Sequence, residues 1–129
     1  MQRFDVVIIG SGLAGLTVAL NLADHKKIGL ITKKALIDGA SSWAQGGIAA
    51  VLGNDDSIAE HIKDTLVAGA GLCDETVTRY VVERGRDSVQ WLIKQGVRFT
   101  RDVESDSGYH LSREGGHSHR RVIHAADAT

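Results

Sequence analysis

The sequence contains a single cysteine, Cys73, among its 129 residues. One thiol cannot form a disulfide within the chain, and such low cysteine content is typical of a reducing compartment, so we predict a cytoplasmic location. We interpret Cys73 as a small buried residue rather than a catalytic thiol. The sequence also lacks an apolar stretch long enough to cross a bilayer.

An excess of charge of either sign is also missing. The chain has 15 Lys and Arg residues against 16 Asp and Glu residues, which gives a formal net charge of −1. A near-neutral chain offers no overall electrostatic attraction to nucleic acid or to an anionic membrane. We therefore expect neither of these as a partner.

The densest pattern in the chain lies near its start, in residues 4–23, FDVVIIGSGLAGLTVALNLA. The opening apolar, mostly β-branched run predicts a strand that is buried on both faces. Gly10, Gly12 and Gly15 follow with G-x-G-x-x-G spacing, and the next apolar residues recur at helical spacing. In a strand–turn–helix unit, the first glycine permits the tight turn, the second lets a pyrophosphate approach the backbone, and the third lets the helix pack on the sheet. Because the helix N-terminus offers free amides to phosphates, the pattern predicts a dinucleotide site.

A second strand is predicted over residues 28–32, IGLIT, which completes a parallel βαβ unit. Dinucleotide sites of this kind usually carry Asp or Glu at the end of that strand, where the acid holds ribose hydroxyls. That acid is missing here, and Thr32 and Lys33 stand in its place. A threonine hydroxyl can bond a ribose and a lysine can meet a phosphate, so both are candidate cofactor ligands.

Residues 38–53, DGASSWAQGGIAAVLG, are rich in glycine, alanine and serine, as a flexible linker would be. Interleaved apolar residues such as Trp43 and Val51 argue against a linker, because their side chains favour burial. Small residues around Gly46 and Gly47 let backbone N–H groups approach a flat ring, which suits an isoalloxazine.

Helices are predicted to follow as a scaffold. Ser57 opens a capping box, S-x-x-E, so a helix should start directly after it. Asp74 can cap a second helix, Gly85 should break or bend it, and Gly96 should end the helical stretch beyond. Residues 97–100 are predicted as a short strand.

The final segment, residues 109–129, holds four of the six histidines, three arginines and Glu114, which precedes a Gly-Gly pair. A metal site is one interpretation, because His117-x-His119 would place two imidazoles on one face of a strand, although no carboxylate or cysteine completes a familiar spacing. A solvated basic loop is the second. The third, which we favour, is an anion-binding substrate loop, in which arginine pairs with carboxylates and Glu114 holds a substrate ammonium. The arginines are Arg113, Arg120 and Arg121.

Together these stretches resemble the N-terminal part of the succinate dehydrogenase/fumarate reductase flavoprotein family. The most specific matches are AQGGIAA and REGGHSHRR, which occur here in the family's order. The resemblance implies an α/β fold with a Rossmann-type parallel sheet. It implies that residues 1–129 are the N-terminal portion of a truncated FAD-binding domain, without the family's capping and C-terminal helical domains. It also accounts for Thr32 and Lys33, because family members carry Thr or Ser followed by Lys at this place.

The resemblance implies FAD as the cofactor. We expect no metal, because no carboxylate or cysteine completes a familiar ligand spacing with the histidines. The FAD would be bound non-covalently, because Ala40 stands where covalent members carry the histidine that attaches the flavin. The N-terminus of the first helix would lie on the pyrophosphate, and the loop that follows the second strand would wrap the flavin. The implied cofactor ligands are Gly10, Ser11, Gly12, Leu13, Ala14, Gly15, Thr32, Lys33, Ala40, Ser41, Ser42, Trp43, Ala44, Gln45, Gly46 and Gly47.

Glu114 indicates a branch of the family. The dicarboxylate dehydrogenases and reductases carry no acid at this place, whereas the branch that oxidises L-aspartate carries Glu, which is thought to recognise the amino group. A carboxylate attracts the ammonium of aspartate and repels succinate, which has none. The resemblance therefore implies FAD-dependent oxidation of L-aspartate to iminoaspartate, with Glu114 orienting the substrate. His117, Ser118 and Arg120 are weaker candidates for lining the same site.

The resemblance also implies the context of the reaction. Oxygen, with hydrogen peroxide as product, or fumarate would accept the electrons, and iminoaspartate would feed quinolinate and NAD synthesis, with quinolinate synthase as the pathway neighbour. Two alternatives stay open, a soluble fumarate reductase or succinate dehydrogenase flavoprotein and an inactive FAD-domain fragment. We expect the 129-residue chain alone to be inactive and to bind FAD poorly, because further ligands and the catalytic arginine would lie outside it.

Overall fold

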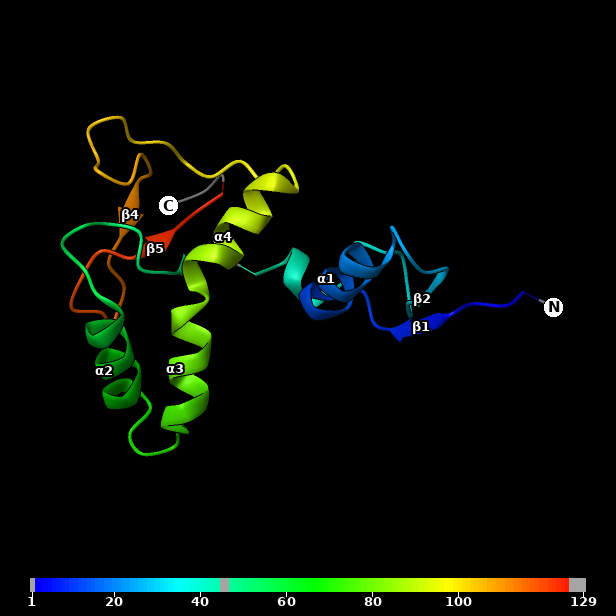
Figure 1. The fold of residues 1–129 in the computed structure, drawn as a ribbon, viewed down its shortest axis with the longest axis horizontal. Helices are drawn as coiled ribbons and strands as arrows, with labels where there is room; N and C mark the ends of the chain where they lie inside the picture. Colours follow the sequence, from blue (N-terminus) through cyan, green and yellow to red (C-terminus); the bar gives the residue numbers. More distant parts are fainter. Residues whose placement is uncertain (1, 45–46, 126–129) are drawn as a thin grey trace. The chain divides into compact units, whose positions relative to one another are not determined.

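The computed structural model describes residues 2–44 and 47–125, which form two compact units that divide after residue 45. Each unit contains its own small sheet. Figure 1 shows the N-terminal unit in blue and cyan and the C-terminal unit in green to red. None of the described helices is both long and apolar enough to cross a membrane.

The N-terminal unit is the predicted strand–helix–strand. Strand β1 (Val6–Ile9) leads through a glycine turn into helix α1 (Leu13–Leu22), and strand β2 (Ile28–Ile31) returns beside β1. The two strands pair in parallel over their full length. This arrangement confirms the predicted parallel βαβ unit and the α/β fold class.

Strand β1 is not buried on both faces, so that prediction was wrong for the described residues. Ile8 lies close to Gly15 of α1, whereas Val7 and Ile9 are 53% and 84% exposed. The described part of this unit has one α-helix, α1, and a single helix can cover only one face of the sheet.

The C-terminal unit joins three helices to a three-stranded antiparallel sheet. Its strands are ordered β3-β5-β4, so the last strand in sequence occupies the middle of the sheet. Figure 1 shows α2 and α3 side by side and α4 continuing from α3. The elements are β3 (Ile48–Ala49), α2 (Ile58–Ala68), α3 (Glu75–Glu83), α4 (Gly85–Lys94), β4 (Leu111–Ser112) and β5 (Val122–Ile123).

The core of this unit lies where α4 meets the sheet. Its buried side chains come from α4, from two strands and from the segments that follow β3 and α4. They are Ala50, Val89, Phe99, Leu111 and Ile123. Burial of such apolar side chains is the main stabilising contribution to a unit of this size.

The predicted helix boundaries are confirmed by their caps. The Ser57 hydroxyl accepts a hydrogen bond from the Glu60 amide at 3.2 Å and starts α2. The Asp74 carboxylate accepts one from the Val77 amide at 2.9 Å and starts α3. Arg84 separates α3 from α4 and Gly85 is the first residue of α4, so the helical stretch is interrupted where Gly85 was expected to break or bend it.

The strand predicted for residues 97–100 does not form. Gly96, with φ of +96°, turns the chain after α4. Only Thr100 then reaches the sheet, where its amide donates to the His124 carbonyl at 2.8 Å and its carbonyl accepts from the His110 amide at 3.1 Å. A single residue with such bonds makes no ladder, so the segment stays irregular.

Candidate functional site

The turn between β1 and α1 demands glycine at two positions. Gly10 has φ of +107°, and its amide donates to the Ile31 carbonyl of β2 at 2.8 Å. A side chain at Gly15 would place its Cβ 2.1 Å from the Gly10 carbonyl oxygen, which no atom can tolerate. The tight turn and the close helix packing that the glycine spacing predicts are both present.

The N-terminus of α1 offers backbone donors to a ligand. Gly12 is the N-cap, and no side chain caps the helix apart from a long 3.4 Å contact between the Leu13 amide and the Ser41 hydroxyl. Within the described residues, the amides of Ser11, Gly12 and Ala14 have no acceptor in the protein. The first turn also contains no acidic side chain that would repel an anion. This donor set fits a pyrophosphate.

The loop after β2 lies beside that turn. It forms a short 3-10 helix, η1 (Ala40–Ser42), and a Cβ on Gly39 would be 3.8 Å from the Ser11 carbonyl oxygen. Trp43, which the sequence predicts to be buried, is instead 80% exposed, because no described residue of this unit covers its indole. Val51, in the same predicted segment, is buried in the C-terminal unit as expected.

Exposed apolar side chains occur throughout this unit, and four of them belong to the elements that meet at the turn. These four belong to the end of each strand, the first residue of α1 and the loop, and a buried cofactor ring is the kind of group that such a surface would cover. They are Ile9, Leu13, Ile31 and Trp43. The residues present therefore fit a dinucleotide with an aromatic ring.

The remaining expected cofactor ligands are placed as follows. The Thr32 hydroxyl closes a local turn by donating to the Lys34 carbonyl at 2.8 Å, while the side chain of Lys33 is exposed. Gly47 packs against β5, where a Cβ would lie 2.3 Å from the Ile123 carbonyl oxygen. Ala44 is exposed, and Gln45 and Gly46 lie outside the described residues.

The loop between β4 and β5 carries Glu114 in a tight turn. The Glu114 carbonyl accepts a hydrogen bond from the His117 amide at 3.2 Å, and Gly116 takes a φ of +84° that favours glycine. The Glu114 side chain is exposed, and within the described residues its carboxylate has no hydrogen bond or ion pair. An unpaired carboxylate on a fixed turn can receive a cationic ligand group.

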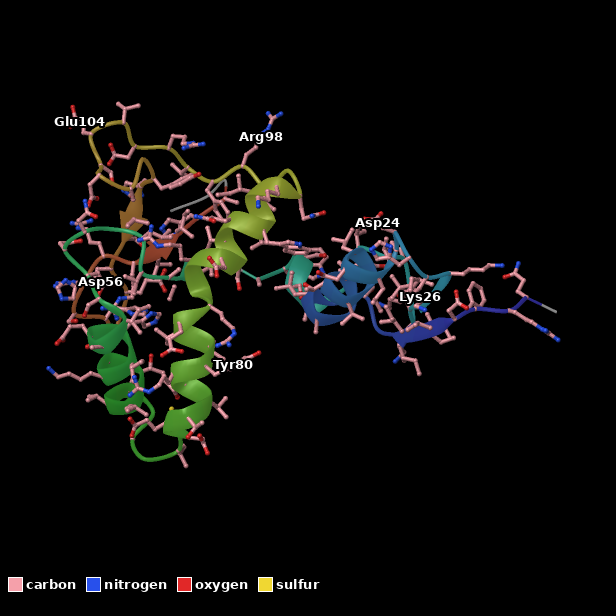
Figure 2. All side chains as sticks on the ribbon, viewed as in Figure 1. Asp24, Lys26, Asp56, Tyr80, Arg98 and Glu104 are labelled. Atoms are coloured by element: carbon pink, nitrogen blue, oxygen red, sulfur yellow. The ribbon has the colours of Figure 1, made fainter. Side chains whose placement is uncertain are left out.

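Arg121, which the sequence suggests as a substrate ligand, is fully buried and already paired. Its Nε and Nη2 atoms donate to both oxygens of Asp56 at 2.7 Å, and Nη1 donates to Asp64 at 2.7 Å. Asp56, labelled in Figure 2, lies just before α2. A buried guanidinium requires such compensation, so Arg121 holds the fold and has no free donor face for a substrate carboxylate. Of the three arginines in the predicted anion-binding segment, Arg121 is therefore unavailable to a substrate.

The His117-x-His119 pair is not on a strand, so the geometric basis of the metal interpretation was wrong. His117 lies in the turn, with Nδ1 3.4 Å from Nη1 of Arg121 and its ring against the His61 ring at 5.9 Å. His119 instead lines a cavity of about 520 Å³ together with Arg113. Among the described residues, no group of three or more His, Cys, Asp or Glu side chains is placed to hold a metal ion.

Asp64 is the residue of this site that sequence reasoning missed. One of its oxygens accepts bonds from the Ser118 amide and the Ser118 hydroxyl, both at 2.7 Å. These two bonds and the Arg121 guanidinium lower the pKa of Asp64 to about 2. Burial, together with the positive charge of Arg121, lowers the pKa of nearby His61. The sequence signal for Asp64 is the position of Arg121 directly before the buried strand β5, because a buried arginine requires an acidic partner.

We expect Asp64 to make the protein acid-sensitive. A carboxylate whose pKa is lowered from 3.8 to about 2 stabilises the fold above pH 4, and this contribution is lost as the pH falls toward 2. At neutral pH it is worth about 2 kcal/mol. Urea unfolding of the wild type and of Asp64→Asn between pH 6 and pH 3 checks this. The stability gap between them should narrow as the pH falls, and a constant gap would contradict the assignment.

Comparison with known proteins identifies relatives along the whole chain. Residues 5–129 match the family model described as FAD binding domain. L-aspartate oxidase 1 of Ralstonia nicotianae is 66% identical over 99% of this chain and 24% of its own length. L-aspartate oxidase of Pseudomonas aeruginosa is 56% identical over 98% of this chain and 24% of its own length. The chain thus spans about a quarter of the length of the curated relatives that it matches.

Solved structures show the same fold. A quinol-fumarate reductase with menaquinol molecules aligns with a TM-score of 0.87 at 32% identity, covering 98% of this chain and 22% of that one. Mycobacterium smegmatis Sdh1 in complex with UQ1 aligns with a TM-score of 0.87 at 28% identity, covering 99% of this chain and 22% of that one.

Proposed function

The chain belongs to the family of FAD binding domains of the succinate dehydrogenase/fumarate reductase flavoproteins, and from this premise we propose that it serves the FAD-dependent oxidation of L-aspartate to iminoaspartate. The observation that carries the choice of substrate is Glu114. Its carboxylate is exposed, unpaired within the described residues, and held on a backbone turn. The names of the relatives, L-aspartate oxidase, support the same choice.

In the proposed mechanism, FAD supplies the two-electron redox chemistry, and the chain's own residues bind and orient. The free amides at the start of α1 would hold the pyrophosphate, and further ligands are proposed from the turn, the end of β2 and the loop that follows it. These ligands are Gly10, Ser11, Gly12, Leu13, Ala14, Gly15, Thr32, Lys33, Ala40, Ser41, Ser42, Trp43, Ala44, Gln45, Gly46 and Gly47. Ala40 offers no nucleophile for a covalent link, so binding is non-covalent.

Glu114 provides the selectivity. An ammonium within about 4 Å of a carboxylate gains Coulomb energy of about 1–4 kcal/mol, depending on solvent access, and a charge-assisted hydrogen bond as well. Succinate lacks the ammonium and would bring only negative charge to Glu114. Orientation of the amino group also fixes the face of the α-carbon that is presented for oxidation.

The surrounding chemistry is proposed on the same basis. The reaction uses oxygen or fumarate as the electron acceptor, takes place in the cytoplasm, and delivers iminoaspartate to quinolinate and NAD synthesis beside quinolinate synthase. A second candidate is a fumarate reductase or succinate dehydrogenase flavoprotein, because solved neighbours with those names share the fold at 28–32% identity. That candidate leaves the Glu114 carboxylate without a function.

Replacing Glu114 by glutamine in the natural protein that carries this sequence tests the proposal. We expect kcat/KM for L-aspartate to fall about 10- to 100-fold, since a charge-assisted bond is worth about 1.5–3 kcal/mol. The matched control is Glu104→Gln, an exposed carboxylate in the preceding loop, labelled in Figure 2, which should leave kcat/KM unchanged. An unchanged kcat/KM in Glu114→Gln, or higher turnover of succinate than of L-aspartate in the wild type, would contradict the proposal.

A further inference from the structure

The loop that carries Glu114 is bonded to a buried ionic cluster, which consists of Arg121, Asp56 and Asp64. Residues 113–121 connect β4 to β5, and their end is fixed where the Arg121 amide donates to the Ser112 carbonyl at 3.1 Å. Between these points the loop leaves the sheet and packs on α2, where a Cβ on Gly116 would lie 3.4 Å from that of Ala68. The loop therefore takes its position from the helix as well as from its own strands.

The strongest tie between loop and helix is Asp64. Its Oδ2 atom accepts three hydrogen bonds at 2.7 Å, from the Ser118 amide, the Ser118 hydroxyl and Nη1 of Arg121. Two of the three donors belong to Ser118, in the middle part of the loop, and the third belongs to Arg121 at its end. Charge-assisted bonds of this length are about twice as strong as neutral ones, so the tie is rigid.

Helix α2, which carries Asp64, is itself held firmly in the C-terminal unit. Arg121 also grips both oxygens of Asp56, just before α2, and Ile62 buries the inner face of the helix with only 4% exposure. The guanidinium thus fastens α2 to β5 while Asp64 fastens α2 to the loop. Any displacement of Ser118 requires breaking this cluster.

We propose that Asp64 is a positioning residue that, through Ser118, holds the Glu114 turn where the substrate ammonium binds. This inference rests on the proposed function, because it assigns Asp64 a task in recognising L-aspartate. Glu114 lies four residues before Ser118, and the bond between the Glu114 carbonyl and the His117 amide closes the turn between them. A loop that is free at Ser118 lets that turn shift, and a displacement of about 1 Å is enough to weaken an oriented contact strongly.

The test compares Asp64→Asn and Ser118→Ala with the wild type in the natural protein. The first removes the charge at unchanged size. The second removes only the hydroxyl bond of an exposed residue, so it keeps the fold should the first fail to fold. We expect kcat/KM for L-aspartate to fall about tenfold in Asp64→Asn and about threefold in Ser118→Ala, mainly through KM, because the ammonium contact is made in the bound substrate as well as in the transition state. The control is Ser107→Ala, whose hydroxyl donates to the Tyr109 carbonyl in another loop and which should change neither kinetic parameter.

Two further measurements distinguish a positioning role of Asp64 from a general loss of stability. Amide hydrogen exchange of residues 114–118, measured in the flavin-free protein, should accelerate at least about tenfold in Asp64→Asn, while α3 and α4 keep the wild-type rates. In a double-mutant cycle, Asp64→Asn should lose its effect on KM when Glu114 is already glutamine.

Faster exchange with an unchanged KM for L-aspartate, or full additivity in the cycle, would overturn the positioning role. If Asp64→Asn does not fold, an unchanged KM and unchanged exchange in Ser118→Ala would overturn it. A wild type that does not oxidise L-aspartate contradicts the proposed function instead. The exchange of residues 114–118 in the flavin-free protein would then still show whether Asp64 holds the turn.

Discussion

Replacing Arg121 by alanine should lower the free energy of unfolding of the natural protein by about 3–5 kcal/mol, the usual cost of leaving a buried charge without its partner. The Arg121 side chain is fully buried, and its three donors satisfy Asp56 and Asp64 at 2.7 Å. Without the guanidinium, the Asp56 and Asp64 carboxylates face the buried space that it filled. They must then ionise at a cost or take up protons, and either outcome destabilises the fold at neutral pH.

Urea unfolding at equal flavin content measures this loss. The matched control is Arg79→Ala, because Arg79 pairs with Glu75 on the surface of α3 at 3.2 Å with both side chains more than half exposed. A surface pair of this kind is worth about 0.3–0.5 kcal/mol. Equal losses in the two variants would show that the buried cluster does not hold the C-terminal unit together.

A second large effect is expected at the nucleotide turn, where Gly15→Ala should abolish FAD binding. The new Cβ would sit 2.1 Å from the Gly10 carbonyl oxygen, so α1 must move away from the turn. The amides at its N-terminus move with it, and the pyrophosphate loses its donors. We expect at least a tenfold lower flavin content in the purified protein, read from the flavin absorbance, because several charge-assisted bonds are lost together.

Two other glycines supply the controls for this experiment. A Cβ on Gly12 would be 3.7 Å from the Ser41 hydroxyl, an ordinary contact, so Gly12→Ala should fold normally and lose flavin only because the side chain blocks the pyrophosphate. Gly115→Ala meets nothing within 4 Å and should keep both fold and flavin. Stoichiometric FAD in Gly15→Ala would contradict the role that we give to this turn.

The nucleotide turn was predictable because its requirements are local. The spacing of Gly10 and Gly15 reflects a clash between atoms five residues apart, and the caps at Ser57 and Asp74 involve donors three residues away. Such contacts leave a signature in a short window of sequence. The parallel βαβ unit and the helix boundaries followed from them.

Burial and charge pairing were less predictable because they depend on distant residues. Arg121 looked like a substrate ligand in its own segment, yet its partner Asp56 stands 65 residues earlier. Trp43 and the outer face of β1 looked like core positions, but burial requires a covering element, and the described part of the N-terminal unit has a single α-helix. The apolar character of a side chain does not show which element of the fold, if any, will cover it.

Anaerobic reduction of the flavin is the most direct test of the proposed function. L-aspartate and succinate are added separately to the natural protein without oxygen, and bleaching of the flavin absorbance is followed in time. We expect rapid bleaching by L-aspartate and none by succinate, since only L-aspartate offers an ammonium to Glu114. Bleaching by succinate alone would contradict the proposal and move the protein to the dicarboxylate branch, where the Glu114 carboxylate has no substrate group to bind.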